Sequence, residues 1–306
     1  MQLKFAIQEF LEDRHYKNLS SYTLKMYKQN LGLFLDYCTL QNVSNVLNVK
    51  PLHVKGFMFA CKEEGNKPST LNNKLRSIKV FFNYLVEEEI IEKNQHPAMR
   101  VRTVKEDIKI EVLTDKQIRE LLNYFKRFNF RGNSFTAYRN RMIVIFLLST
   151  GVRRGELTNL KWSDIDFNNQ TIALFGKKRQ IASIPFTKKL KSELAQYRLF
   201  LQDYFGEESE YVFTTNRNKG LTIEGVASIF KKLKKIMEFQ GVRLSSHTFR
   251  HTFAHRSILN GMDVMTLQKI LRHENVQMTQ RYVNLWGTAL KEQNDKYNPL
   301  NNIDIG

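Results

Sequence analysis

The longest apolar run of the chain, Met142 to Leu148, constrains the fold most, because it leaves no polar face for solvent. Residues 142–149 have the pattern of a helix that is apolar all round, so we predict a helix that is buried on every side. Gly151 follows where a glycine commonly ends a helix. The run is far shorter than the roughly 18 residues of a membrane-spanning helix. Other elements of a globular domain must therefore surround it.

The patterns on either side of this run differ in period. On the N-terminal side, Thr114–Gln117 has the form of a capping box, followed by apolar residues on one helical face. On the C-terminal side, residues 171–175 and 181–184 are predicted strands, joined by the loop 176–180. Helices are expected to resume at about Thr222. The sequence thus predicts a mainly α domain with a small antiparallel β-sheet.

The first hundred residues have helical patterns alone. Ser20 or Ser21 can cap one helix, and Pro68 opens another. After His96-Pro97, the segment Met99 to Ile110 is polar and has no period, as is typical of a linker.

Because 306 residues exceed what one core usually needs, we expect two domains. The predicted division is a helical domain over residues 1–100, a linker over 101–110, a second domain over 111–286, and a polar, Asn-rich tail over 287–306.

Charge indicates the class of partner. The net charge is +18, and residues 1–100 hold 14 Lys and Arg against 10 Asp and Glu, which leaves +14 on the remaining 206 residues. Folded basic chains of this kind most often bind nucleic acid. An anionic membrane is the alternative, but no basic amphipathic anchor helix is found. Cys38 and Cys61 lack metal-binding spacing, and the first ten residues lack a secretory signal, so we expect a cytoplasmic protein with reduced thiols.

Two cations lie where they can enter a cleft. Arg153 follows the buried helix, and its guanidinium can bind two phosphate oxygens. The alternative is a surface arginine paired with Glu156. Lys177 is at the tip of the predicted hairpin, where a lysine can reach a nucleic-acid groove and donate a proton. The alternative is a solvated turn lysine.

Histidines cluster near the end of the chain. His247 and Arg250 are three residues apart, so on a helix they share a face and can bind a phosphoryl oxygen and manage a proton. His251 and His255 continue the series at helical spacing, which invites a metal site. Without H-E-x-x-H or paired carboxylates, we expect no metal there, and interpret both as packing or hydrogen-bonding residues.

A tyrosine follows this cluster. Tyr282 comes nine residues after His273, with Arg272 and Arg281 close by in the sequence. A phenol next to cations and imidazoles is a candidate nucleophile for a phosphate. Most tyrosines serve only in packing, so the position gains weight from the rest of the series.

Together these residues resemble the active-site series of the tyrosine recombinases, the family of lambda integrase and the Xer proteins. T-G-V-R-x-x-E-L is similar to the family's first arginine box, with Glu156 as its acidic companion. G-K, seven residues and P resembles the hairpin lysine segment. S-x-H-x-x-R-H-T-F-A resembles the second box, and L-x-H nine residues before Tyr the third. In order, the series is Arg153, Lys177, His247, Arg250, His273 and Tyr282.

The resemblance implies a helical core-binding domain, an α+β catalytic domain and a mechanism. Tyr282 attacks a DNA phosphodiester and forms a 3′-phosphotyrosyl ester, while Lys177 protonates the leaving 5′-hydroxyl. Arginines stabilise the non-bridging oxygens, one histidine helps to accept the tyrosine proton, and another binds the phosphate. These roles fall to Arg153 and Arg250, to His247, and to His273.

Neither metal, cofactor nor ATP is required in such a mechanism. Further contacts to DNA are expected from Lys178, Arg179, Arg154 and Arg243. The implied partners are double-stranded DNA with inverted-repeat core sites, three further copies of the chain in a tetramer that exchanges the tail 287–306, and accessory DNA-bending proteins. The two-domain layout resembles recombinases of mobile elements or phages. One departure is Arg272, where many relatives have glycine.

Three other functions remain open at this point. A type IB topoisomerase-like enzyme shares the chemistry but relaxes DNA as a monomer. A non-catalytic DNA-binding accessory protein would need none of the six site residues. A metal-dependent nuclease would use the histidine helix and would lose its activity in EDTA.

Overall fold

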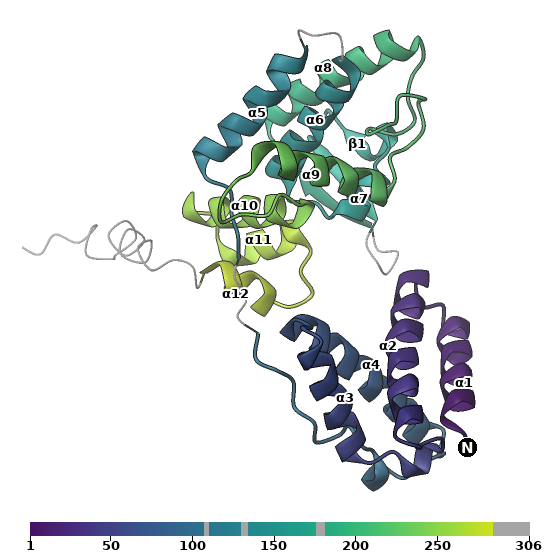
Figure 1. The fold of residues 1–306 in the computed structure, drawn as a ribbon. Coiled ribbons are helices and arrows are strands. Elements are labelled where there is room, and N and C mark those ends of the chain that lie inside the picture. Colours follow the sequence, from purple (N-terminus) through teal and green to yellow (C-terminus); the bar gives the residue numbers. More distant parts are fainter. Residues whose placement is uncertain (107–109, 130–133, 176–180, 284–306) are drawn as a thin grey trace, which may run out of the picture. The chain divides into compact units, whose positions relative to one another are not determined.

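The computed structural model describes residues 1–106, 110–129, 134–175 and 181–283 (Figure 1). The chain divides into two compact units, Met1–Ile108 and Lys109–Gly306. Lys177, Lys178, Arg179 and the tail 287–306 lie outside the described residues, so what the sequence predicts for them stays a prediction.

The described part of the first unit is all helical, with two short 3-10 turns. Ser20 caps α2 by accepting a hydrogen bond from the Thr23 N–H, and Pro68 is in the first turn of α4, as predicted. Phe10 is at the centre of the core, with Phe81 and Tyr84 packed edge-on at 5.6 and 5.5 Å between ring centroids. The elements are α1 (Leu3–Tyr16), α2 (Ser21–Leu40), η1 (Val46–Asn48), α3 (Pro51–Glu63), α4 (Pro68–Glu87) and η2 (Lys93–Gln95).

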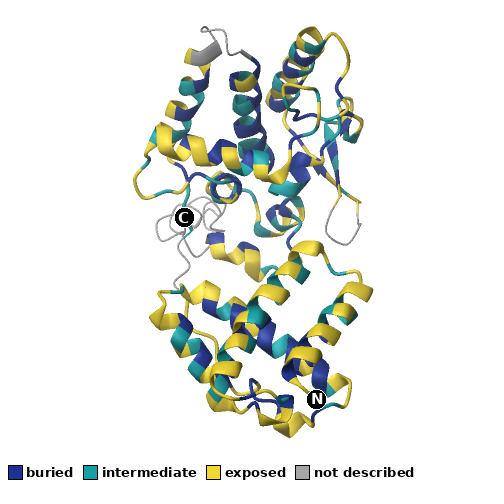
Figure 2. Cartoon of the chain, turned by 45° about the vertical axis from the view of Figure 1, so that its right-hand side comes forward, coloured by how far each residue is buried: buried dark blue, intermediate teal, exposed yellow. Residues whose placement is uncertain are grey.

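In the second unit, helices surround the predicted buried helix. This helix, α6 (Ser134–Thr150), packs against α5 (Asp115–Asn129), α8 (Lys188–Phe205) and α10 (Ser246–Leu259). Met142 to Val144, Phe146 and Leu147 are fully buried, whereas Ile145, Leu148 and Ser149 are half-buried. The helix is therefore buried over most of its surface but not on every side as predicted. Figure 2 shows how burial is distributed over the described elements. The remaining helical elements are α7 (Arg154–Thr158), η3 (Trp162–Asp164), α9 (Ile223–Met237), α11 (Val264–Leu271) and α12 (Gln277–Val283).

A small antiparallel sheet in the order β1-β2-β3 completes the described fold. The two predicted strands are β2 (Thr171–Phe175) and β3 (Ile181–Pro185), and Ile172 pairs with Ile184 in their register. The two-residue strand β1 (Ile165–Asp166) pairs with the other edge of β2. The predicted mainly helical class with a small antiparallel sheet is confirmed.

The expectation that helices resume only at about Thr222 is wrong. Helix α8 comes directly after the sheet, and Thr187 caps it by accepting from the Leu190 N–H. It buries one narrow face, formed by Leu190, Leu194, Tyr197 and Leu201. Its first turn is lysine-rich, and the exposed Leu199 and Tyr204 lie outside the buried face, so apolar residues do not form a single helical stripe in the sequence.

The capping box at the start of α5 is confirmed. The Thr114 N–H donates to Gln117 Oε1 at 2.9 Å, and the Gln117 N–H donates to Thr114 Oγ1 at 3.2 Å. Just before it, the Leu113 N–H donates to Thr252 Oγ1 in α10 at 2.9 Å. Across the described residues, no helix is long and apolar enough to cross a membrane.

Candidate active site

The first site residue, Arg153, is positioned by a sharp end to α6. Gly151 has a left-handed φ of +61°, and a Cβ there would lie 2.5 Å from the ring of Phe253, so glycine is required. The turn places Arg153 at the N-cap of α7. Glu156, three residues on, accepts the Arg153 backbone N–H at 2.7 Å and its Nη1 at 3.0 Å. Because the carboxylate caps the helix and pairs with the guanidinium, both are held in one orientation.

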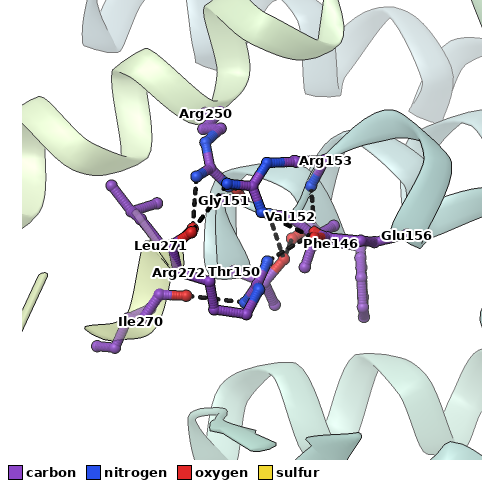
Figure 3. A network of polar contacts seen from close by, with 10 residues as sticks. All are labelled: Phe146, Thr150, Gly151, Val152, Arg153, Glu156, Arg250, Ile270, Leu271 and Arg272. Atoms are coloured by element: carbon purple, nitrogen blue, oxygen red, sulfur yellow. Dashed lines mark hydrogen bonds and ion pairs between the residues drawn. The ribbon is translucent and has the colours of Figure 1, made fainter. Parts of the chain in front are cut away.

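A second arginine shares this carboxylate. Arg272 Nη2 donates to Glu156 Oε2 at 2.6 Å (Figure 3). The Arg272 carbonyl accepts in turn from Arg153 Nη2 at 2.9 Å. Burial alone would raise the pKa of Glu156, but the opposing effects of Arg272 and Arg153 are together larger, so the pKa is lowered. The carboxylate is therefore ionised at neutral pH.

Arg250, on α10, is the buried arginine of the site. It is 5% exposed and donates to the carbonyls of Gly151 and Leu271, both at 2.6 Å (Figure 3). These carbonyls are neutral acceptors, so its charge stays uncompensated by direct ion pairing within the described part of the chain. Burial and the neighbouring Arg153 lower its pKa to about 10, which still leaves a cation at pH 7.

Tyr282 and His251 form a pair between α12 and α10. The Tyr282 hydroxyl lies 2.8 Å from His251 Nδ1. Tyr282 is 3% exposed and packs with apolar residues of α10 and α11. Burial raises its pKa, against the opposing effects of Arg250 and Arg281. Burial, together with His247 and the nearby arginines, lowers the pKa of His251 to about 4. The pair at neutral pH is therefore a neutral imidazole and a protonated phenol.

The other two predicted histidines flank this pair. His273 is buried, its ring stacks on Tyr282 at 6.5 Å between centroids, and its Nδ1 lies 2.8 Å from Thr279 Oγ1. Burial and the arginines lower the pKa of His273 to about 4. His247 is on the exposed side of α10, with its ring 6.5 Å from that of His251. Desolvation and three arginines lower the pKa of His247 as well.

The predicted DNA contacts that the structure describes lie near the solvent. Arg154 is the first residue of α7 and is half-buried, and its charge is one of those that lower the pKa of His247. Arg243 is exposed and precedes α10, and its backbone N–H donates to Glu111 Oε2 at 2.6 Å.

Two residues with a place in the site were not predicted for it. His251 was expected to pack or to hydrogen-bond, and its hydrogen bond is to the predicted nucleophile. Its spacing of four residues from His247 was the available signal, and it also fitted a metal site. Among the described residues, however, no three of the histidines, cysteines and carboxylates are grouped to bind a metal ion. For Arg272, the sequence gives only a departure from the glycine of many relatives and predicts no role.

The described arrangement thus combines cations with a phenol. Arg153 and Arg272 share the carboxylate of Glu156, Arg250 is bound by two carbonyls, and the neutral imidazoles of His251 and His273 border Tyr282. Uncompensated cations favour an anion with several oxygens, such as a phosphodiester. A phenol hydrogen-bonded to an imidazole is poised to act as a nucleophile.

Two family models match this chain. Residues 111–286 match the phage integrase family, and residues 7–89 match the phage integrase N-terminal SAM-like domain. The chain belongs to the phage integrase family.

Relatives of the full chain agree with this membership. Tyrosine recombinase XerC of Oceanobacillus iheyensis is 27% identical over 98% of this chain and 98% of its own length. Tyrosine recombinase XerD of the same organism is 26% identical over 97% of this chain and 99% of its own. The predicted kinship with the tyrosine recombinases is confirmed.

A solved structure shows the same fold. The Tn1549 transposon integrase in complex with transposon right end DNA has a TM-score of 0.74 to this phage integrase family member, at 21% identity, with 92% of this chain and 94% of that chain covered.

Proposed function

We propose that this member of the phage integrase family is a site-specific recombinase that cleaves and rejoins DNA through a 3′-phosphotyrosyl intermediate. The observation that carries the proposal is the hydrogen bond between Tyr282 and His251, next to the guanidiniums of Arg153 and Arg250. Phosphoryl transfer to a phenol needs a proton acceptor and cations for the non-bridging oxygens. The described residues supply both.

The proton of Tyr282 passes to His251 in this mechanism. The imidazole is neutral at pH 7, so Nδ1 accepts the phenolic proton as the tyrosyl oxygen bonds to phosphorus. The bond from phosphorus to the 5′ oxygen breaks, and that oxygen takes a proton from the general acid. When a 5′-hydroxyl attacks the ester, the same proton returns to Tyr282. His247, expected from the sequence to help accept this proton, is the next imidazole along α10.

The arginines stabilise the charge of the phosphorane. Arg250 is fixed by two carbonyls, and Arg153 by Glu156 and the Arg272 carbonyl, so neither has to reorganise when the charge develops. The Arg153 side chain is 37% exposed, which leaves it accessible to a phosphate. His273, whose ring stacks on that of Tyr282, supplies a further hydrogen bond to the phosphate.

Lys177 is the proposed general acid, on the basis of the sequence. An alkoxide needs a proton to leave, whereas a thiolate does not. Lys177→Ala should therefore cleave normal DNA slowly and a 5′-bridging phosphorothiolate substrate at nearly the wild-type rate. If sulfur fails to rescue the variant, Lys177 is a phosphate contact instead.

The proposed partner is duplex DNA with inverted-repeat core sites, bound by a tetramer that exchanges residues 287–306. The net charge of +18 supports phosphate binding by both units. The logarithm of affinity should then fall with that of salt with a slope near −0.9 for each phosphate neutralised. A role in a mobile element is supported by the transposon integrase among the structural neighbours. Accessory DNA-bending proteins and a cytoplasmic location belong to the same proposal.

The test uses DNA that flanks the gene of this protein, because mobile-element recombinases often act beside their own gene. Footprinting locates the site, and a nicked duplex of that sequence traps the covalent complex. The proposal expects an adduct at the 3′ phosphate that maps to Tyr282, formation of this adduct in excess EDTA, and strand exchange between two duplexes. Relaxation of supercoils without strand exchange would indicate a topoisomerase, and binding without an adduct would indicate an accessory protein.

A further inference from the structure

We propose that Arg272 is a positioning residue of the active site, which acts through Glu156 to keep Arg153 from being neutralised by that carboxylate. The proposal rests on the proposed phosphoryl-transfer function. It concerns a position that departs from the glycine of many relatives, so it is a property of this chain.

The C-terminal end of α11, with its C-cap Arg272, organises three guanidiniums with three successive carbonyls. The Ile270 carbonyl accepts from Arg272 Nη1 at 2.8 Å, and the Leu271 carbonyl accepts from Arg250 Nη2 at 2.6 Å. The Arg272 carbonyl accepts from Arg153 Nη2 at 2.9 Å (Figure 3). The last carbonyls of a helix lack intrahelical partners and are its negative end, which suits them to hold cations. Whatever fixes this turn therefore fixes both proposed phosphate-binding arginines.

The backbone at this turn favours glycine. Arg272 has a left-handed φ of +54° as the C-cap of α11. A residue with a Cβ is strained there, while glycine is not. The arginine side chain compensates through its bond to Glu156, since the two side chains are 12% and 6% exposed and lie 2.6 Å apart. A charge-assisted hydrogen bond of this kind is about twice as strong as one between neutral groups.

The Arg272 side chain is too enclosed to contact a phosphate directly. Nε is fully buried and has no hydrogen-bond partner in the described part of the chain, and both terminal nitrogens are occupied by Ile270 and Glu156. The side chain is thus enclosed within the protein, and its charge reaches the phosphate through the shared carboxylate. Glu156 Oε1 binds the Arg153 guanidinium, and Oε2 binds the Arg272 guanidinium and the Arg153 backbone N–H. One carboxylate thus faces two guanidiniums, and the pair of arginines keeps a net positive charge.

Arg272→Gly removes the guanidinium and relieves the backbone at once. We expect it to bind DNA with unchanged affinity and to keep the thermal midpoint of the wild type, but to form the phosphotyrosyl adduct about tenfold more slowly, the scale of coupling within one ion-pair network. Arg272→Lys, which retains the charge, should restore most of the rate. Lys269→Gln removes an exposed charge from the same helix and controls for overall charge.

Two measurements separate this role from a structural one. On a substrate with a neutral methylphosphonate at the scissile position, the deficit of Arg272→Gly should shrink strongly, because less charge has to be stabilised. In a Glu156→Gln background, the same substitution should have little further effect, because Arg272 acts through that carboxylate.

Three results would overturn the inference: a wild-type rate for Arg272→Gly, equal deficits on both substrates, or the full deficit without Glu156. Absence of an adduct with the wild-type protein would instead refute the proposed function.

Discussion

Buried basic side chains are held differently in the two units, as Lys74 and His96 show beside Arg250. In the first unit, His96 is buried with Nδ1 accepting from the Ala98 N–H and Nε2 3.1 Å from Asn83 Oδ1, and Lys74 lies 3.2 Å from Cys61 Sγ. These partners are at most 13 residues away in the sequence. In the second unit, Arg250 reaches Gly151 across 99 residues, and Arg153 reaches Arg272 across 119.

The difference separates structural from functional burial of polar groups. A neutral His96, bonded to Asn83 of α4 and to the Ala98 N–H, connects the segment after η2 to α4 and contributes no charge. The cations of the second unit are held by neutral carbonyls and one shared carboxylate, and their charge remains available. Burial of a charge costs free energy unless it is compensated. We infer that the anion expected at this site supplies the missing compensation.

The largest effect is expected at Tyr282. Tyr282→Phe removes a single oxygen, so the ring still packs in its apolar site while no phosphotyrosyl ester can form. The covalent adduct on a nicked duplex should disappear, with DNA affinity unchanged in the same gel. An adduct that survives, or one that maps to Tyr297, contradicts the assignment.

Whether the sequence could predict an interaction depends on how far apart its two residues lie along the chain. Several local signals are confirmed: Ser20 as a cap, the box at Thr114, and one helix, α10, that carries both His247 and Arg250. The His251–Tyr282 pair spans 31 residues and the Arg272–Glu156 pair 116, so no local pattern could show them. The family resemblance predicts the order of the site residues but gives Arg272 no role, because many relatives have glycine there.

The second largest effect is expected at the buried arginine of the site. A second buried arginine of the same unit, away from the site, tests whether position or burial causes the effect. Arg250 and Arg139 are both buried and both bonded to neutral oxygens, Arg139 to Thr214 and Asn140. Lysine at either position keeps the positive charge but loses the planar set of N–H donors of the guanidinium. Arg250→Lys should slow adduct formation by roughly 10³-fold, the upper range for one preorganised oxyanion donor.

Arg139→Lys is the matched control, since it should lower the thermal midpoint by a similar amount and leave the rate of the folded protein unchanged. Equal losses of rate in both variants would show that burial, and not position at the site, sets the effect.

A smaller effect is expected for the proposed proton acceptor. His251→Leu should slow cleavage by roughly 10²-fold, the low end for general-base catalysis. His255 is on the same helix one turn further on, with a pKa also lowered by burial, so His255→Leu controls for loss of a partly buried imidazole. If His247→Leu costs more than His251→Leu in single-turnover cleavage, the proton goes to His247.

The smallest effect is a difference in acid stability. The folded-state pKa values of His251 and His273 are about 4, below the ordinary value of 6.5, because burial and nearby cations disfavour the charged rings. The unfolded chain therefore binds more protons, and the second unit should lose stability as the pH falls from about 6.5 towards 4. In the first unit, His96 shifts in the same direction.

Tryptophan fluorescence reports on the second unit, since both tryptophans, Trp162 and Trp286, are in its sequence. The urea midpoint measured by fluorescence should fall between pH 7 and pH 5. The fall should shrink in the double variant His251→Gln/His273→Gln and persist in His96→Gln. A fall that persists undiminished in the double variant would place the acid sensitivity outside the site, and the contrast between the two units would then not extend to their titration.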